Sequence, residues 1–295
     1  MKGRQLRIYL VDGTPTGILT AEIINWTGKV IVAPRSQLAD LALRPEVRRT
    51  GIYCLVGPDP SNPLRDRIYV GEGDSVMARL LQHAKDENKD FWTRAVVVIS
   101  KDDNITKSHG RYLESQLIRR AVAASRASVG NGTSPDVPPL PEPDVADMDF
   151  FLAQLEMIFP VLGMNFLLPQ PVFSATASAA GEQSPRFVMT DVGNKAYAAE
   201  IGGEFVVFKG STARKQGAES WQSYKSLRQE LIDDNKLVHS QMPEYYVFAE
   251  DVAFSSPSAA AAVVAAGERN GRYAWKDEET GRSCSVEKIT TGRGC

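Results

Sequence analysis

The sequence predicts an α+β protein with more than one globular part, and three observations support this class. The chain has 295 residues, of which 43% are hydrophobic and 24% charged, so it can form a sizeable core. Short segments rich in β-branched residues alternate with longer segments in which apolar residues recur every three or four positions. A proline-rich stretch at 130–148 has the composition of a linker between the two halves.

A β-rich extension is expected at the N-terminus. Residues 5–11 predict a strand, and residues 17–33 predict a hairpin. Residues 36–45 predict a short helix, with Ser36 at its N-cap and Pro45 at its end. This extension contains no catalytic motif that we recognise.

The next segment has the order strand, strand, helix, strand, helix. Its expected strands are Gly51–Val56, Arg67–Val70 and 94–100, and its expected helices are 75–85 and 108–127. Asp74 or Ser75 can cap the first of these helices with its side chain. The loop between the first two strands is rich in Gly, Pro, Asp and Asn, which favour turns.

The remaining chain is expected to contain a connector and a second domain. Residues 149–163 are apolar and partly helical in pattern, and residues 171–184 predict a second flexible joint. Further along, the expected elements are strands at 187–189 and 204–208 and helices at 220–234 and 256–266, the last with Ser256 as N-cap and Pro257 in its first turn. The predicted boundaries are 1–47 for the extension, 48–131 for the first domain, 132–148 for the linker, 149–184 for a helical connector and 185–295 for a C-terminal α+β domain.

Charge is unevenly distributed along the chain. Residues 1–130 carry 20 Lys and Arg against 14 Asp and Glu, a net charge of +6, and residues 131–295 carry 14 against 22, a net charge of −8. A moderately basic half can hold a polyanion such as nucleic acid. Chance clustering would give the same asymmetry, so charge alone is a weak indication.

The sequence also bears on location. The three cysteines, Cys54, Cys284 and Cys295, stand far apart and form no CxxC pair, which favours a reducing, cytoplasmic environment. No apolar stretch reaches the roughly 18 residues of a membrane span, so no membrane association is expected.

The residues best suited to chemistry lie around the first strand pair. Tyr53 and Tyr69 occupy neighbouring strands, so both phenols can point to the same face if the strands pair. Gly71 and Gly73 allow the backbone to turn and to approach a ligand closely. A strand tyrosine taken alone is more often a core aromatic than a catalyst.

Two later helices supply charged side chains. Arg79 and His83 are four residues apart on one helix and share a face, while Glu114 lies beside the apolar side of the second helix. Phosphodiester hydrolysis needs a base for water, a cation for the phosphate oxygens and, in many enzymes, a divalent metal. A solvated helix face and a simple ion pair of Glu114 with Arg111 are the structural alternatives.

The order and spacing of these residues resemble the GIY-YIG nuclease family. The matching elements are GIY at 51–53, Tyr69-Val70-Gly71 in place of YIG, Arg79, His83, Glu114 within RYLESQLI, and Asn131. The resemblance covers less than a third of the chain. It implies a small three-stranded antiparallel sheet flanked by helices. The loop from Cys54 to Ile68 is longer than is common in the family, and Asn131 lies beside the proline-rich stretch.

The resemblance also implies a role for each residue. Tyr53 would act as general base, Tyr69 would orient water or phosphate, and Arg79 would stabilise the pentavalent phosphorus. Glu114 would hold one Mg²⁺ or Mn²⁺ ion, and His83 would bind phosphate or move a proton. Gly71, Gly73 and Asn131 would contact the substrate. His109 has no role in the family that we can assign.

These roles predict a metal-dependent DNA endonuclease acting in repair, mobile-element biology or phage defence. DNA rather than RNA is the expectation that the family carries. One alternative is a catalytically inactive nucleic-acid-binding module. Another is an unrelated metabolic enzyme with a coincidental GIY, although Gly71-Glu72-Gly73 is too short to be a nucleotide-binding loop.

The C-terminal block resembles a domain of unknown function that typically follows GIY-YIG domains in bacterial proteins. The segments that carry the resemblance are 205–214, 223–232 and 254–276. Two interpretations remain open: a packing or dimerisation module, which would make the protein a homo-oligomer, and a substrate-recognition module. In the second, phosphates would contact Lys209, Arg214, Lys215, Lys225 and Arg228.

Overall fold

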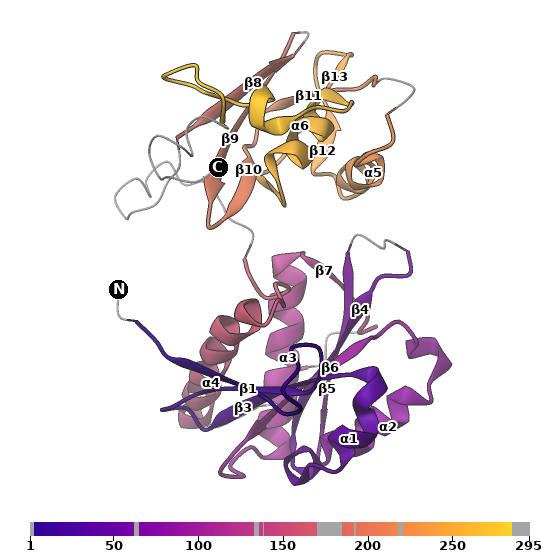
Figure 1. Cartoon of the computed structure of the whole chain (residues 1–295), viewed down its shortest axis with the longest axis vertical. Helices are drawn as coiled ribbons and strands as arrows, with labels where there is room; N and C mark the ends of the chain where they lie inside the picture. Colours follow the sequence, from indigo (N-terminus) through magenta and orange to yellow (C-terminus); the bar gives the residue numbers. More distant parts are fainter. Residues whose placement is uncertain are drawn as a thin grey trace. The chain divides into compact units, whose positions relative to one another are not determined.

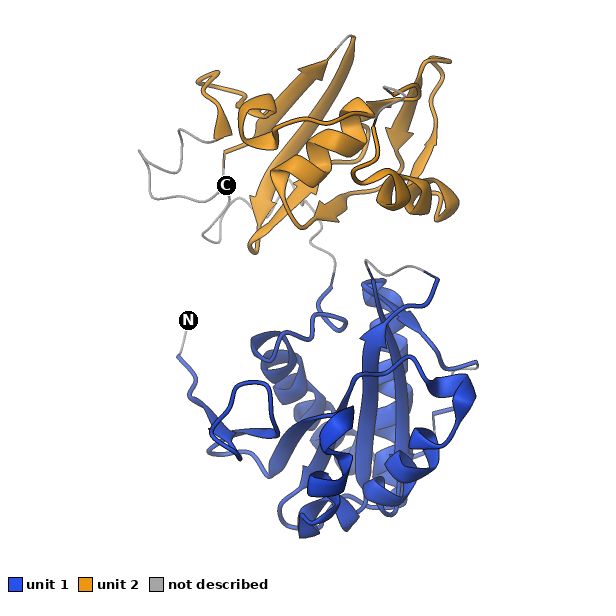
Figure 2. Ribbon diagram, turned by 45° about the vertical axis from the view of Figure 1, so that its right-hand side comes forward, with its two compact units in different colours: residues 1–169 blue, residues 170–295 orange. Residues whose placement is uncertain are grey.

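The computed structural model describes residues 3–61, 65–132, 136, 137, 139–169, 185–191, 193–217 and 221–284. The chain divides into two compact units, unit 1 at residues 1–169 and unit 2 at residues 170–295 (Figure 2). Each unit combines helices with β-sheet, which confirms the α+β class. The second flexible joint expected at 171–184 lies outside the described residues.

Unit 1 is built on a seven-stranded sheet with the order β1-β2-β3-β6-β4-β5-β7 (Figure 1). The strands are β1 Leu6–Leu10, β2 Leu19–Ile23, β3 Gly28–Pro34, β4 Gly51–Pro58, β5 Asp66–Gly73, β6 Arg94–Ser100 and β7 Ala127–Val129. Neighbouring strands are antiparallel except β5 and β7, which are parallel.

The expectation of a small three-stranded sheet with a separate N-terminal extension was wrong in extent. The antiparallel strands β6-β4-β5 are present, but β3 pairs with β6 along its whole length and continues the same sheet. The reason is that Val30, Ile31 and Val32 alternate between two apolar layers, so β3 is buried on both faces and cannot be an exposed appendage.

Helices cover both faces of this sheet (Figure 1). The helices of unit 1 are α1 Leu38–Ala42, α2 Val76–Ala84, α3 Lys107–Ala124 and α4 Glu142–Val161, with 3-10 helices η1 Arg35–Gln37, η2 Pro45–Arg48 and η3 Glu87–Lys89. In β4, Ile52 and Cys54 contribute to the apolar core shared with α3 and α4, while Tyr53 and Leu55 contribute to the core shared with α1 and α2. Strand β4 is therefore buried from Gly51 to Gly57.

The α3 helix is fixed at its start by a reciprocal cap. The Thr106 side chain accepts a hydrogen bond from the backbone N–H of His109, and the His109 ring accepts one from the backbone N–H of Thr106. Nε2 of His109 also lies 3.4 Å from Asp144 of α4. His109 therefore has a structural role. In contrast, neither Asp74 nor Ser75 caps α2 with its side chain.

The prediction of a linker over the whole of 132–148 was wrong, because α4 begins inside it at Glu142. The helix continues to Val161, through the first part of the connector predicted at 149–184. Proline lacks a backbone N–H, but the first turn of a helix has free N–H groups, so prolines there start a helix without breaking it. Phe151 and Leu155 are buried against the sheet core, so α4 belongs to unit 1.

The short helix predicted at 36–45 is also corrected. Ser36 lies inside η1 and caps nothing, and α1 starts after Gln37 without a side-chain cap. Pro45 does not simply end a helix but opens η2, where its fixed φ angle is suited to the first turn.

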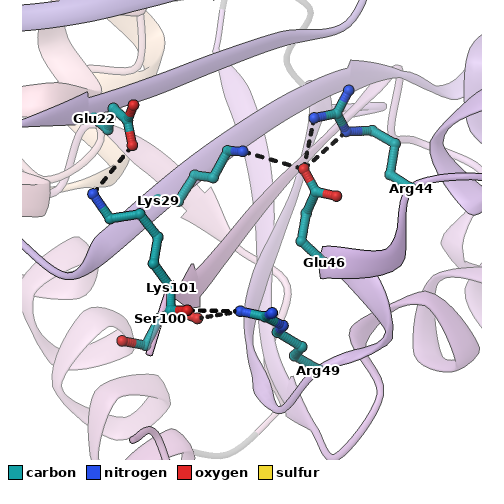
Figure 3. Close-up of polar contacts among 7 residues, drawn as sticks. All are labelled: Glu22, Lys29, Arg44, Glu46, Arg49, Ser100 and Lys101. Atoms are coloured by element: carbon teal, nitrogen blue, oxygen red, sulfur yellow. Dashed lines mark hydrogen bonds and ion pairs between the residues drawn. The ribbon is translucent and has the colours of Figure 1, made fainter. Parts of the chain in front are cut away.

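A polar cluster ties the η2 segment to the sheet (Figure 3). Glu46 accepts hydrogen bonds from Lys29 of β3 at 3.2 Å and from Arg44 at 2.6 Å. Burial alone would raise the pKa of Glu46, but its hydrogen bonds to the backbone and to these two cations outweigh burial and lower it. Arg49 donates to the carbonyl oxygen of Lys101 at 3.0 Å, just beyond β6. These contacts hold the start of β4 in register.

Unit 2 contains a five-stranded sheet, β14-β10-β9-β8-β15, and a three-stranded sheet, β11-β13-β12. Its elements are β8 Phe187–Asp191, β9 Asn194–Ile201, β10 Glu204–Val207, β11 Thr212–Arg214, α5 Lys225–Asp233, β12 Leu237–His239, β13 Tyr245–Phe248, β14 Val252–Phe254, α6 Pro257–Ala265, α7 Gly271–Ala274 and β15 Lys276–Asp277. The predicted cap of α6 is confirmed, because the Ser256 hydroxyl accepts from the backbone N–H of Ala259 at 3.1 Å. Within the described residues, no helix is long and apolar enough to span a membrane.

Candidate functional site

Pairing of β4 with β5 brings the two tyrosines together. Tyr53 lies opposite Gly71, and Leu55 lies opposite Tyr69, so both phenols are on the face of the sheet that α2 covers. Their ring centroids are 6.5 Å apart. Tyr53 is fully buried, whereas Tyr69 is half-buried and can meet a ligand.

His83 of α2 contacts both tyrosines. Its Nε2 lies 2.7 Å from the Tyr53 hydroxyl oxygen, and Nζ of Lys89 lies 3.3 Å from its Nδ1. A lysine ammonium group has donors and no acceptor, so Nδ1 must accept and Nε2 must carry the proton. His83 therefore donates to the oxygen of Tyr53 and cannot take the Tyr53 proton at that nitrogen.

The protonation state of His83 agrees with this arrangement. Burial, followed by the positive charges of Lys89 and Arg79, lowers the pKa of His83 from 6.5 to about 4. The ring is therefore neutral near pH 7. The Lys89 ammonium group also lies 3.5 Å from the centroid of the Tyr69 ring, a cation–π contact that places a positive charge beside both aromatic groups.

Arg79 connects the tyrosines to the carboxylates. Burial, and then the neighbouring Tyr69, raises the pKa of Tyr53, while the hydrogen-bonded guanidinium group of Arg79 opposes that rise. The charge of Arg79 also interacts with Glu72 and Glu114. Arg79 is largely exposed and donates to Gln82 at 3.0 Å, so it can turn toward an incoming anion.

Glu114 and Glu72 form an acidic pair on the opposite face of the sheet. By alternation from Val70, Glu72 faces α3, where a Cβ placed on Gly110 would lie 3.5 Å from the Cβ of Glu72. Burial, and next the charge of Glu72, raises the pKa of Glu114 to about 7. The Arg79 side chain reaches toward this pair from α2, so groups from both faces meet at β5.

The two glycines of β5 make this meeting possible. A Cβ on Gly71 would overlap the hydroxyl and ring of Tyr53, and a Cβ on Gly73 would lie 2.7 Å from Cγ of Arg79. Both glycines belong to the extended strand and neither has a positive φ angle, so the expected sharp turn is not observed. Their contribution is space for Tyr53 and Arg79, and their contact with substrate stays a prediction.

Asn131 has a structural role at the edge of the sheet. Its amide donates to the carbonyl oxygen of Val70 at 2.8 Å and accepts from the N–H of Val70 at 3.0 Å. Backbone pairing between β7 and β5 ends at Ile68. The Asn131 side chain takes the place of a strand backbone beside Val70 and so extends the hydrogen bonding along β5. A contact with substrate would have to use the second amide hydrogen.

The acidic pair fits a hard divalent cation. In the part of the chain that the structure describes, no group of three or more His, Cys, Asp or Glu side chains is arranged to hold a metal. Mg²⁺, however, commonly takes only one or two protein carboxylates and completes its coordination with water and phosphate. Glu72 has a buried Oε2 atom with no hydrogen-bond partner among the described residues, which leaves an oxygen for such an ion beside Glu114.

Two functional candidates, Glu72 and Lys89, were missed from the sequence. The signal for Glu72 was present, because alternation from Ile68 and Val70 already places it on the α3 face. Lys89 lies in η3, which follows α2, and its contact with His83 depends on how that 3-10 turn folds back. No local pattern indicates such a contact.

The low pKa of His83 predicts a pH dependence of stability. The folded pKa of about 4 lies below 6.5, so the unfolded chain binds the proton more readily, and stability is lost as pH falls from about 6.5 toward 4. We expect His83→Gln to flatten this dependence by about 1 kcal/mol between about pH 7.5 and pH 5, with allowance for partial screening. Urea unfolding of both proteins at the two pH values measures it. Parallel stability curves would contradict a neutral buried His83.

Comparison with protein families gives a match in unit 2. The family profile described as a domain of unknown function (DUF4357) matches residues 187–286. This match covers about a third of the chain and lies within the block for which such a domain was expected. No curated protein and no solved structure gave a significant match.

Proposed function

We propose that unit 1 is an endonuclease of the GIY-YIG type that hydrolyses phosphodiester bonds of DNA with the help of Mg²⁺ or Mn²⁺. The observation that carries the proposal is the convergence of Tyr53, Tyr69, Arg79, His83 and Glu114. These residues come from two strands and two helices, they are separated by up to 61 positions in the sequence, and they interact around Gly71 and Gly73. The resemblance of 48–131 to that nuclease family supports the same assignment.

Tyr53 is the group that we assign to the attacking water. This role needs the phenolate, which burial opposes by raising the pKa of Tyr53 and which the donors from His83 and Arg79 at its oxygen stabilise in part. Once the phenol proton has passed to solvent, the phenolate can accept a proton from the attacking water. Arg79 can then pair with the nonbridging phosphate oxygens, on which negative charge develops. Tyr69, half-buried beside Lys89, is placed to orient the phosphate or the water.

Glu114 and Glu72 would hold the divalent cation. When bound, the cation would polarise the phosphate and stabilise the leaving oxygen. The high pKa of Glu114 has burial and a like charge as its causes, and both favour binding of a positive ion by the ionised carboxylate.

The proposal is tested by incubating the full chain with labelled single-stranded, duplex, flap and branched DNA, with Mg²⁺, with Mn²⁺ or with EDTA. We expect cutting of at least one form that requires the metal. Binding of DNA without cutting under all conditions would instead support the inactive binding module. If the protein neither binds nor cuts any of these DNA forms, both interpretations are overturned.

The role of Tyr53 is tested by Tyr53→Phe, which removes only the hydroxyl oxygen. Loss of a general base predicts a fall in cleavage rate of at least about 100-fold. Tyr112→Phe is the matched control. Tyr112 is also buried, and its hydroxyl donates a hydrogen bond of 3.0 Å to Asp149, which is not part of the candidate site. Both variants lose one hydrogen-bonded hydroxyl group and about 1 kcal/mol of stability. Equal cleavage by the two variants would remove Tyr53 from the mechanism.

A further inference from the structure

Unit 2 contains a cavity of about 300 Å³ beside α5, which lies next to β12 and β13 in Figure 1. The residues that give it its chemistry are three cations and two aromatic groups: Lys215, Lys225, Arg228, Trp221 and Tyr246. Among the described residues that line it there is no carboxylate. This is a marked local excess of positive charge, since residues 131–295 carry a net charge of −8.

Arg228 is a buried cation without a carboxylate partner among the described residues. It is 5% exposed, and its guanidinium group donates to the backbone carbonyl oxygens of Val263 at 3.2 Å, of Arg214 and of Lys215. Burial lowers the pKa of Arg228 to about 10, so the group stays charged near pH 7. A buried charge that is not neutralised favours an anion brought from outside.

Trp221, which lines the same cavity, carries an unused donor. The residue is 6% exposed, and its indole N–H is buried without a hydrogen-bond partner among the described residues. A buried N–H without an acceptor costs about 1–3 kcal/mol. An acceptor atom on a ligand seated against Trp221 would remove that cost, so the indole group is a second, independent indication of a ligand.

The aromatic rings lie directly beside the cations. The guanidinium carbon of Arg228 lies 5.8 Å from the Trp221 ring centroid and 5.5 Å from that of Tyr246, and Nζ of Lys215 lies 5.4 Å from the latter. Aromatic side chains combined with Lys and Arg are the combination with which proteins bind single-stranded nucleic acid, through base stacking and phosphate pairing.

We propose that this cavity binds one nucleotide unit, with the phosphate between Lys215, Lys225 and Arg228 and the base against Trp221 and Tyr246. Of the five cations expected to contact phosphate, these three line the cavity, whereas Lys209 does not and Arg214 lies 3.9 Å from Asp191. The same chemistry is offered by a free nucleotide and by a nucleotide within a single strand. The site lies in unit 2 and does not depend on the nuclease proposal.

The test measures binding of a fluorescein-labelled ten-residue oligothymidylate to the full chain by anisotropy, in EDTA so that no cleavage occurs. The double variant Lys215→Gln with Lys225→Gln is compared with the control Lys195→Gln with Lys276→Gln. The control lysines are exposed on unit 2 outside the cavity and change the net charge equally. Trp221→Phe removes the indole donor and keeps an aromatic ring. Thermal unfolding of each variant checks its fold.

We expect at least tenfold weaker binding for the cavity pair, a clear but smaller loss for Trp221→Phe, and little change for the control. The dependence of log K on log salt should also become shallower by about 0.7 for each phosphate that no longer pairs with a lysine. Equal effects of the two lysine pairs would overturn the proposal, even if the protein cuts DNA. Conversely, an absence of nuclease activity would leave it standing.

Competition identifies the ligand. Unlabelled thymidine monophosphate should displace the oligonucleotide better than inorganic phosphate does, because only the nucleotide carries a base. Equal displacement by both would overturn the nucleotide assignment. If thymidine monophosphate binds as tightly as the oligonucleotide, the site is supported and its ligand is a free nucleotide. If the oligonucleotide binds more tightly than the monophosphate, the site is supported and its ligand is a single-stranded nucleic acid.

Discussion

Replacing Glu114 with Gln should abolish metal-dependent cleavage while making the metal-free protein more stable. The amide keeps the shape of the carboxylate but lacks the charge that would hold a divalent cation. A bound cation is worth several kcal/mol to the transition state, so we expect cleavage to fall by at least about 10³-fold. Folding should be preserved, because the substitution is isosteric.

The gain in stability follows from the raised pKa of Glu114. In the folded protein this pKa is about 7, above the ordinary 4.5, so the folded state holds the proton more tightly than the unfolded state. The stability that the protonated Glu114 contributes to the natural protein is therefore lost as pH rises from about 4.5 through 7. Glu114→Gln does not ionise, and above pH 7 it should be more stable by about 1–2 kcal/mol after allowance for solvent screening.

Urea unfolding in EDTA at about pH 5 and pH 8 measures the stability difference, and cleavage with Mg²⁺ measures activity. Glu87→Gln is the matched control, since Glu87 is exposed in η3 and should change neither quantity. A Glu114→Gln protein that still cuts DNA at the natural rate would show that this carboxylate does not hold the metal. Higher stability with unchanged cleavage would mean that Glu114 is only a buried charge.

Local patterns predicted most elements of unit 1, because its strands and helices have clear boundaries in the sequence. The apolar segment RAVVVIS coincides with β6, and the helical periodicity after Ser75 coincides with α2. The extent of the sheet was not predictable in this way. Pairing of β3 with β6 joins residues that are 60 to 72 positions apart in the sequence, and no short-range pattern specifies which strand edge an apolar strand will meet.

Composition was a poor guide at α4. Prolines and acidic residues at 130–148 favour a linker, but Pro141 and Pro143 lie where a helix begins and Glu142 and Asp144 occupy its first turn. Both residue types are favourable at that position and unfavourable deeper inside a helix. The same residues therefore predict opposite structures according to whether an apolar segment follows closely enough to be buried.

The residues of the candidate site were predictable as a set, but their partners were not. Spacing placed Tyr53, Tyr69, Arg79 and His83 near one another. The direction of the hydrogen bond at Tyr53 depends on Lys89, whose contact with His83 is tertiary. Asn131 was predicted to contact substrate, and its bonds to the backbone of Val70 could not be foreseen without knowing that β7 pairs with β5.

Substituting Ala for the two glycines of β5 should separate the packing role of Gly71 from that of Gly73. In Gly71→Ala the new Cβ would overlap the hydroxyl and ring of Tyr53. Tyr53 is fully buried and bonded to His83, so its ring cannot move freely. We expect a loss of stability of about 1–3 kcal/mol from overpacking. A displacement of the phenol of about 1 Å should also lower cleavage by on the order of 100-fold.

In Gly73→Ala the new Cβ would lie 2.7 Å from Cγ of Arg79, an exposed side chain that can turn away, and 3.3 Å from the backbone oxygen of Ser75. Stability should therefore change by less than about 0.5 kcal/mol, while cleavage falls because Arg79 no longer lies beside Glu72 and Tyr53. Neither glycine has a positive φ angle, so backbone strain does not separate the two variants. Thermal unfolding and cleavage rates of both proteins provide the measurements. Two variants that lose stability equally, or that both cut DNA normally, would show that β5 does not position the tyrosine and the arginine for catalysis.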